Sequence, residues 1–129
     1  MTEEELDFLT VEDLLDVAAG VLDEVAMRDA GLLAAAAARP RVTVFGDDAY
    51  PTFEDKAAAL LHSLVRNHAL VDGNERLAWS ATRVFHLLNG RDLSYTVDDA
   101  EQLMVRAAAG ELDVQDIAGW LVAHRAAAP

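Results

Sequence analysis

The sequence predicts an all-α fold of six helices joined by short loops, with one short non-helical insert near residues 41–51. Apolar residues recur at helical spacing in six separate stretches, and most stretches begin at a Thr or Asp typical of a helix cap. No repeat, linker or shift in composition divides the 129 residues, which suffice for one core. We therefore expect a single domain over residues 1–129.

The first three helices are expected at residues 10–27, 29–38 and 52–67. The first starts with a Thr that is followed three positions later by Asp, as in a capping box, and it carries one apolar stripe. The second is rich in alanine, which lets another helix approach closely, and it stops before Pro40. The third buries an apolar face and places His68 at its C-terminal end.

The remaining helices are expected at residues 74–89, 97–109 and 113–125. The fourth is apolar over more than one face, which is typical of a central helix, and Asn89-Gly90 is a signal for its C-terminus. Thr and Asp residues give cap signals at the starts of the fifth and sixth.

Residues 41–51 interrupt this helical pattern. The first part of the insert, Val42-Thr43-Val44-Phe45, suits an extended segment, and Gly46-Asp47-Asp48 then suits a turn. Such an insert is either an ordinary loop or a flap over a functional site, and the pattern alone leaves both interpretations open.

The composition restricts the chemistry and the partners. The chain has no cysteine, which excludes disulfides, thiolate metal sites and a cysteine nucleophile and fits a reducing cytoplasm. The net charge of −13 repels nucleic acid and anionic lipid, and it serves solubility or suits a basic partner. No apolar run reaches the roughly 18 residues that span a bilayer, and the acidic start is unlike a signal peptide. We expect a cytoplasmic protein without direct nucleic-acid or membrane partners.

The polar run from His68 to Arg76 is the candidate site for chemistry. It joins the third and fourth predicted helices, so a base would stand beside a helix N-terminus, where backbone amides favour anions. His68 is the candidate general base, because histidine ordinarily titrates at roughly pH 6.5. The alternative is a helix-terminal histidine with only a structural role. A base beside an anion-binding helix N-terminus is typical of sites for phosphate chemistry.

Other residues of this run also have both a catalytic and a structural interpretation. Asp72 is a candidate Mg²⁺ ligand or an N-cap of the fourth helix. Gly73 lets a phosphate approach closely or simply permits a turn. Asn74 donates to phosphate, positions the loop or caps the helix. Arg76 offers a planar fork of donors to phosphate or a salt bridge to a nearby acid.

Taken together, the pattern His-x-x-x-Asp-Gly-Asn-x-Arg between two helices resembles the signature of the Fic/Doc superfamily. The resemblance is to the Doc (death-on-curing) branch and covers about residues 8–122. Outside the motif it rests on short segments: Arg28-Asp29-Ala30-Gly31-Leu32-Leu33, Arg39-Pro40, Lys56 to Leu64, Leu77-Ala78-Trp79, Leu87-Leu88-Asn89-Gly90 and Ala109-Gly110-Glu111. It implies a compact all-helical Fic fold.

The resemblance also implies an activity, that of the toxin in a bacterial toxin–antitoxin pair. Fic enzymes generally transfer AMP from ATP to a protein hydroxyl. The Doc branch instead acts as a kinase that moves the γ-phosphoryl group of ATP, with Mg²⁺, to a threonine of elongation factor Tu and so stops translation. The implied partner is a Phd-like antitoxin whose disordered C-terminal segment folds as a helix into a groove on the toxin.

Carried over position by position, the resemblance implies roles for single residues. His68 would take the proton from the target threonine, and Asp72 would hold the metal and orient the loop. The phosphates would lie at the start of the next helix, against Gly73, Asn74 and Arg76. Arg66, just before the motif, would add positive potential. Residues 41–51 match the segment with which family members align the backbone of the target, which favours the flap.

Glu75 departs from the family pattern, because the Doc branch normally has Lys there and Fic enzymes usually have Gly. Exchanging Lys for Glu moves two charges beside the phosphates, and one charge at about 4 Å is worth roughly 1 kcal/mol in water and about 4 kcal/mol in a protein-like dielectric. Three interpretations are open: a deliberate inactivating substitution, an attenuated or degenerate natural homologue, or a side chain that points away and leaves activity intact. We favour impaired catalysis.

Two other functions remain as alternatives to the kinase. The first is a Fic-type nucleotidyltransferase, which usually has a second Arg three positions after the first. Here Leu77, Ala78 and Trp79 follow Arg76, so the second Arg is absent and the kinase is favoured. The second alternative is a catalytically degenerate homologue that retains only the antitoxin groove.

Overall fold

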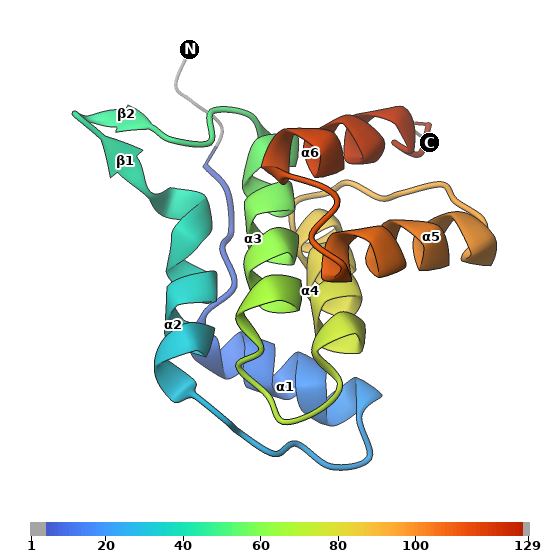
Figure 1. Cartoon of the computed structure of the whole chain (residues 1–129). Helices are drawn as coiled ribbons and strands as arrows, with labels where there is room; N and C mark the ends of the chain where they lie inside the picture. Colours follow the sequence, from blue (N-terminus) through green and yellow to red (C-terminus); the bar gives the residue numbers. More distant parts are fainter. Residues whose placement is uncertain (1–4, 128–129) are drawn as a thin grey trace.

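Helices α3 (Phe53–Asn67) and α4 (Asn74–Leu88) lie side by side at the centre of the molecule (Figure 1), in a computed structural model that describes residues 5–127. The rings of Phe53 and Phe85 stack between them with their centroids 4.8 Å apart. Helix α3 is buried on nearly every side and contributes much of the core: Phe53, Ala57, Ala58, Ala59, Leu60, Leu61, Leu64 and Val65. The loop that joins the two helices is therefore anchored at both ends in the core.

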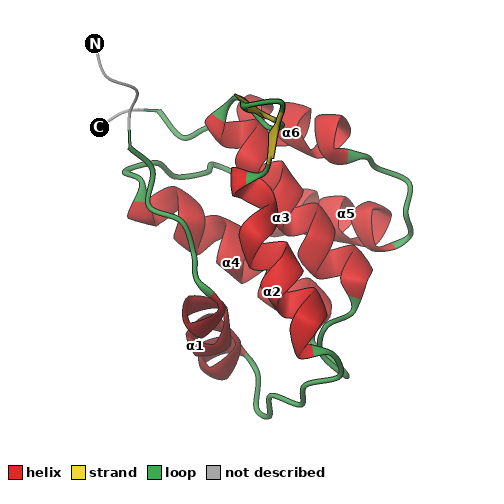
Figure 2. Cartoon of the chain, turned by 90° about the vertical axis from the view of Figure 1, so that its left-hand side faces the viewer, coloured by secondary structure: helices red, strands yellow, loops and turns green. Residues whose placement is uncertain are grey.

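Four further helices surround this central pair. Helix α1 (Val11–Val21) packs against α4, and α2 (Ala30–Ala38) lies along α3 before a short 3₁₀ turn at Arg39–Arg41 (Figure 2). Helices α5 (Val97–Ala108) and α6 (Val114–Ala123) also pack against α3. The predicted all-α fold of six helices is confirmed in the part of the chain that is described.

Side-chain caps fix the starts of the described α-helices other than α4. The caps of α1, α3, α5 and α6 are capping boxes, in which an Asp three residues later returns a bond to the cap residue: Thr10, Thr52, Thr96 and Asp113. Asp29 accepts the amide of Leu32 at the start of α2. Each cap is worth about 1 kcal/mol. Helix α4 begins after Gly73 without a side-chain cap.

The first helix is shorter than its sequence pattern predicts. The predicted range of 10–27 is wrong beyond Val21, where α1 ends. The chain then becomes extended, because it pairs with the loop after α3: the amide of Val71 donates to the carbonyl of Ala26 at 2.8 Å. An isolated antiparallel bridge joins Met27 to Leu70 beside this bond. These long-range bonds replace those that a longer α1 would make.

The sixth helix also ends before its predicted limit of residue 125, at Ala123. The chain beyond it pairs with the segment that precedes α5, where the amide of Ser94 donates to the carbonyl of His124 at 2.7 Å. Arg125 then reaches the buried carboxylate of Glu54 with two hydrogen bonds, of 2.9 and 3.0 Å. Across residues 5–127, none of the helices has the length and apolar character needed to cross a membrane.

The insert at residues 41–51 forms a small antiparallel hairpin of β1 (Thr43–Val44) and β2 (Asp47–Asp48), which projects from one end of the molecule (Figure 1). Both turn residues, Phe45 and Gly46, have positive φ, as a two-residue hairpin turn of type I′ requires. The largely buried Lys56 binds the carboxylate of Asp48 at 3.0 Å and also the carbonyl of Tyr50, which ties the hairpin to α3.

His86 is the most deeply buried histidine of the described residues, at 2% exposed, and its ring packs edge-on against Phe53. Its Nδ1 lies 2.7 Å from the carbonyl of Thr82, whereas its Nε2 is buried without a hydrogen-bond partner in the described part of the chain. Burial lowers the pKa of His86. Folding therefore favours the neutral form of this imidazole.

We expect the protein to lose stability as the pH falls below about 6.5, the ordinary value for histidine, because the unfolded chain then binds a proton that folded His86 resists. His86→Leu should reduce the slope of stability between pH 7 and 5, measured by urea denaturation at several pH values. Part of the slope should remain, since burial and Arg39 also lower the pKa of His62. An unchanged slope in His86→Leu would contradict the prediction.

Candidate active site

The loop between α3 and α4, residues 68–73, begins with a left-handed residue. His68 is the C-cap of α3 with φ 53° and ψ 52°, a conformation that costs a non-glycine residue roughly 1 kcal/mol. This cap turns the chain sharply at the end of the helix and leaves the His68 side chain exposed. His68, the base predicted from the sequence, is therefore the first residue of the loop, and its side chain is exposed.

Asn74 holds the loop together through its side-chain amide. Its Oδ1 accepts the amide of Leu70 at 3.0 Å, and its Nδ2 donates to the carbonyl of the same residue at 3.0 Å. Both backbone groups of the buried Leu70 are thus satisfied by one side chain. Of the interpretations that the sequence left open, the geometry supports loop positioning, because the helix begins after Gly73 without a side-chain cap.

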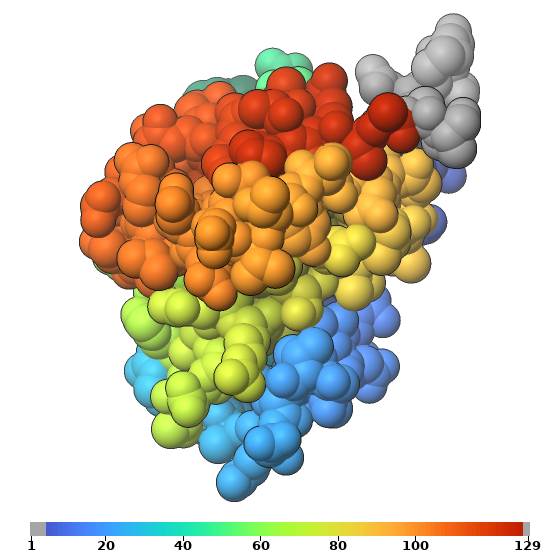
Figure 3. Space-filling view, turned by 90° about the vertical axis from the view of Figure 1, so that its right-hand side faces the viewer, coloured from blue at the N-terminus to red at the C-terminus, as the bar shows by residue number. Residues whose placement is uncertain are grey.

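A cleft of about 780 Å³ opens beside this loop. Its walls come from the segment after α1 and from the ends of α3 and α5, and the loop and first turn of α4 form its floor. In the space-filling view the loop lies between α5 above and the segment after α1 beneath (Figure 3). The lining residues are Leu22, Asp23, Glu24, Ala26, Val65, His68, Val71, Asp72, Gly73, Asn74, Glu75, Arg76 and Ala108.

Most of the site residues predicted from the sequence line this cleft: His68, Asp72, Gly73, Asn74, Glu75 and Arg76. Arg66 is not among the lining residues. Its Nη1 donates to the carbonyl of Ala108 at the end of α5, at 2.6 Å, and its guanidinium lies against Gly110. Arg83, the next cation along α4, is bound to Asp92 at 2.8 Å and does not line the cleft either.

Sequence patterns missed the acidic wall formed by Asp23 and Glu24, because both residues fall in the segment that was predicted to be helical. With Asp72 and Glu75 they place four carboxylates around a cleft whose lining contains one arginine, Arg76. Of the described residues, none forms a hydrogen bond or ion pair with the side chain of Glu75 or Arg76. Both remain available to a ligand.

The start of α4 is suited to an anion. The residues of its first turn line the cleft, no side chain caps its amides, and the helix dipole adds partial positive charge there. Gly73 has φ 85°, and a β-carbon at this position would stand 2.5 Å from Cδ2 of Leu22. Only glycine therefore fits between the loop and the segment after α1 without a shift.

Asp72 is not the N-cap that one interpretation of the sequence proposed. Its Oδ1 accepts the amide of Gly73 at 2.8 Å, and its other carboxylate oxygen has no hydrogen-bond partner in the described part of the chain. Among residues 5–127, no group of three or more acidic, His or Cys side chains is placed to hold a metal ion. One free carboxylate oxygen fits Mg²⁺ that arrives with phosphate oxygens, since Mg²⁺ needs few protein ligands in that case.

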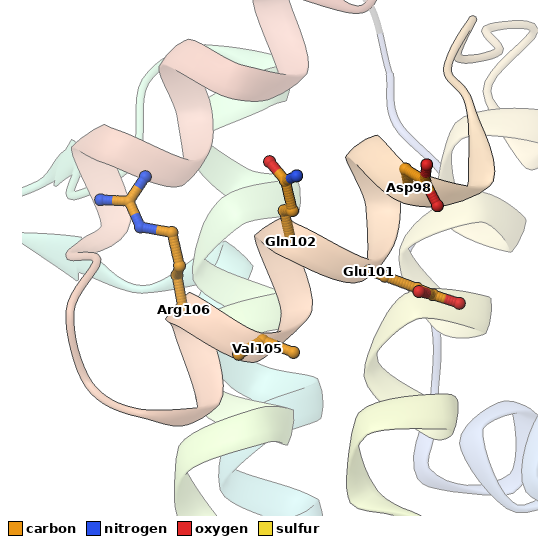
Figure 4. A pocket seen from close by; sticks show the side chains of 5 residues that line it. All are labelled: Asp98, Glu101, Gln102, Val105 and Arg106. Atoms are coloured by element: carbon orange, nitrogen blue, oxygen red, sulfur yellow. The ribbon is translucent and has the colours of Figure 1, made fainter.

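A second, shallower depression of about 380 Å³ lies on the outer face of α5. Its lining comes from that helix alone: Asp98, Glu101, Gln102, Val105 and Arg106 (Figure 4). These side chains point away from the helix into solvent in several directions, and the depression contains no residue of the motif.

The fold and the loop define a class of protein. The Fic/DOC family model matches residues 8–86, and the chain belongs to this family. Over 125 residues it is 50% identical to a protein named Toxin Doc from Mycolicibacterium smegmatis (strain ATCC 700084 / mc(2)155). That similarity covers 95% of this chain and 96% of the relative. The family resemblance of the motif is thereby confirmed.

Asn74→Ala should destabilise the protein by about 1–3 kcal/mol, because it leaves the amide and carbonyl of Leu70 without partners. Urea denaturation at neutral pH measures this loss. The matched control is the neighbouring Glu75→Ala, which removes no hydrogen bond and should cost at most about 1 kcal/mol, the contribution of its charge to the helix dipole. Equal losses in the two variants would mean that Asn74 does not hold the loop.

Proposed function

We propose that this chain is the toxin of a toxin–antitoxin pair and a kinase that transfers the γ-phosphoryl group of ATP to a threonine of elongation factor Tu. The observation that carries the proposal is the placement of His68 beside the uncapped start of α4 in a single cleft. A base and an anion-binding helix start at one site are what phosphoryl transfer to a hydroxyl needs.

In this proposal each residue of the loop has one task. His68 takes the proton of the threonine hydroxyl as its oxygen attacks the γ-phosphorus, and the bond from that phosphorus to the β-phosphate oxygen breaks to release ADP. Arg76 and the first-turn amides of α4 bind the phosphate oxygens, and Asn74 keeps the loop in shape. Asp72 would hold Mg²⁺, which neutralises phosphate charge when bound.

The acidic wall makes the metal important for binding. Four carboxylates surround a cleft with one arginine, so a bare nucleotide is repelled by its surroundings. A nucleotide that carries Mg²⁺ brings its own neutralising charge. Arg66 lies outside the lining, with its guanidinium tied to Ala108, so its part in this proposal is limited to a more distant positive potential.

The name of the relative supports the biological role. Since the protein named Toxin Doc is similar over nearly the whole chain, we infer a toxin here, with a Phd-like antitoxin as its partner in the cytoplasm. The flap expected over the site at residues 41–51 is not found there: none of these residues lines the cleft, and the β1–β2 hairpin projects near the start of α3, whereas His68 follows the end of that helix (Figure 1). The extended edge of the hairpin is exposed, and Lys56 holds its base against α3.

A second candidate function is the transfer of AMP, as in Fic-type nucleotidyltransferases. The residues after Arg76 do not favour it: Leu77 and Ala78 are buried, and Trp79 packs edge-on against Tyr95. None of these positions offers a cation to the cleft, and Arg83 one turn later is engaged with Asp92. This arrangement supports the kinase over the nucleotidyltransferase.

Mass spectrometry of intact elongation factor Tu, after incubation with ATP and Mg²⁺, tests the reaction and the substrate together. With the Glu75→Lys variant we expect the mass to increase by one phosphoryl group on a threonine, and His68→Ala in the same background should abolish it. An increase by one AMP would support the second candidate. If folded Glu75→Lys protein transfers neither group, the chain is a degenerate homologue that retains antitoxin binding.

The charge at position 75 should set the rate. We expect kcat/KM to rise in the order Glu75, Glu75→Gln and Glu75→Lys, because the first change removes a repulsion and the second adds an attraction. The whole series should span roughly a thousandfold, since each 1.4 kcal/mol of transition-state binding is about a factor of ten. Growth arrest in a bacterial host that lacks the antitoxin should follow the same order. Equal rates for the three proteins would show that the side chain points away from the phosphates.

A further inference from the structure

We propose that Arg28 is a positioning residue, whose guanidinium holds the backbone of His68 and thereby fixes where the imidazole stands in the cleft. The inference rests on the proposed function in one respect, the assignment of His68 as the base. Arg28 lies 40 residues before His68, between α1 and α2, and outside the motif.

Arg28 grips the end of α3 with two hydrogen bonds. Its Nε donates to the carbonyl of His68 at 2.5 Å, and its Nη2 donates to the carbonyl of Asn67 at 3.0 Å. The last carbonyls of a helix have no amide partner within the helix, and they carry partial negative charge. A planar, permanently charged fork suits two successive carbonyls better than a lysine ammonium does.

Backbone hydrogen bonds around Arg28 add to the two bonds from its side chain. The amides of Arg28 and Asp29 both donate to the carbonyl of Ala69, at 2.8 and 2.9 Å. On the other side of the bridge, the amide of Val71 donates to the carbonyl of Ala26. Residues 67–71 are therefore bound to residues 26–29 by side chain and backbone together.

The left-handed backbone of His68 explains why the hydrogen bonds from Arg28 are important. A left-handed backbone is disfavoured for a residue with a β-carbon, so the loop needs outside contacts to keep it. Arg28 binds the carbonyl of His68 itself, and this bond restrains ψ at that residue. If the backbone of His68 relaxed to a helical or extended conformation, the imidazole would point elsewhere.

Arg28 does not line the cleft, so it acts through His68 and not on the nucleotide. Steady-state kinetics can therefore distinguish a positioning role of Arg28 from direct contact with the nucleotide. A positioning residue changes kcat and leaves the KM for ATP close to that of the parent, whereas a phosphate contact changes KM as well. A misplaced catalytic group typically loses on the order of a hundredfold in rate.

The test compares Arg28→Met, Arg28→Lys and the control Arg106→Met, each in the Glu75→Lys background. Arg106 is an exposed arginine whose ion pair with Glu111 measures 3.7 Å. We expect Arg28→Met to lower kcat by roughly ten- to a hundredfold at an unchanged KM for ATP. Arg28→Lys should recover part of the loss, and the control should match its parent. A rise in KM with unchanged kcat would overturn the inference.

Amide hydrogen exchange of the same proteins gives a readout that needs no activity. In Arg28→Met the amides of Asp29 and Val71 should exchange faster while those of α6 do not, because the loosening is local. Unchanged exchange at both amides, or a uniform increase throughout the protein, overturns the positioning role even if transfer is observed. Faster local exchange with no transfer in any variant upholds the positioning of the loop and rejects the proposed function.

Discussion

The pairing of residues 26–29 with residues 67–71 is the constraint on which the site depends. These hydrogen bonds join segments about 40 residues apart, and they form only because α1 stops at Val21. Once the chain leaves the helix, Leu22 comes to rest against Gly73, and Asp23 and Glu24 become a wall of the cleft. The interaction that orders the loop after α3 thus also builds the opposite side of the site.

The second feature that sets the site apart is a missing cap. Five of the described α-helices begin with a side-chain cap, worth about 1 kcal/mol each, and α4 does not. Asp72 could have served, but its carboxylate bonds the amide of Gly73 instead. The first-turn amides of α4 that a capping side chain would satisfy can therefore donate to a ligand. A functional site is where such a departure from the local rule is expected.

Local signals account for what the sequence predicted well. The Thr-x-x-Asp caps, the apolar stripes and the motif from His68 to Arg76 all act over a few residues, and the structure places them as expected. The end of α1 could not be predicted in this way, because Leu22 and Val25 continue the apolar spacing of the helix. Its true end depends on hydrogen bonds to residues 69–71, which are distant in sequence. The role of Arg28 was hidden for the same reason.

Glu75 affects the stability of the fold and the electrostatic potential of the site in opposite ways. In the first turn of α4 its charge is favourable to the helix dipole, so the fold gains from it. None of the bonds that shape the loop involves its side chain, since they come from Arg28, Asn74 and the backbone. The geometry of the site is therefore independent of residue 75. What Glu75 changes is the potential at the helix start, where Asp23, Glu24 and Asp72 already act in the same direction. We therefore infer that the charge at position 75, and not the geometry of the loop, would limit the transfer proposed for this chain.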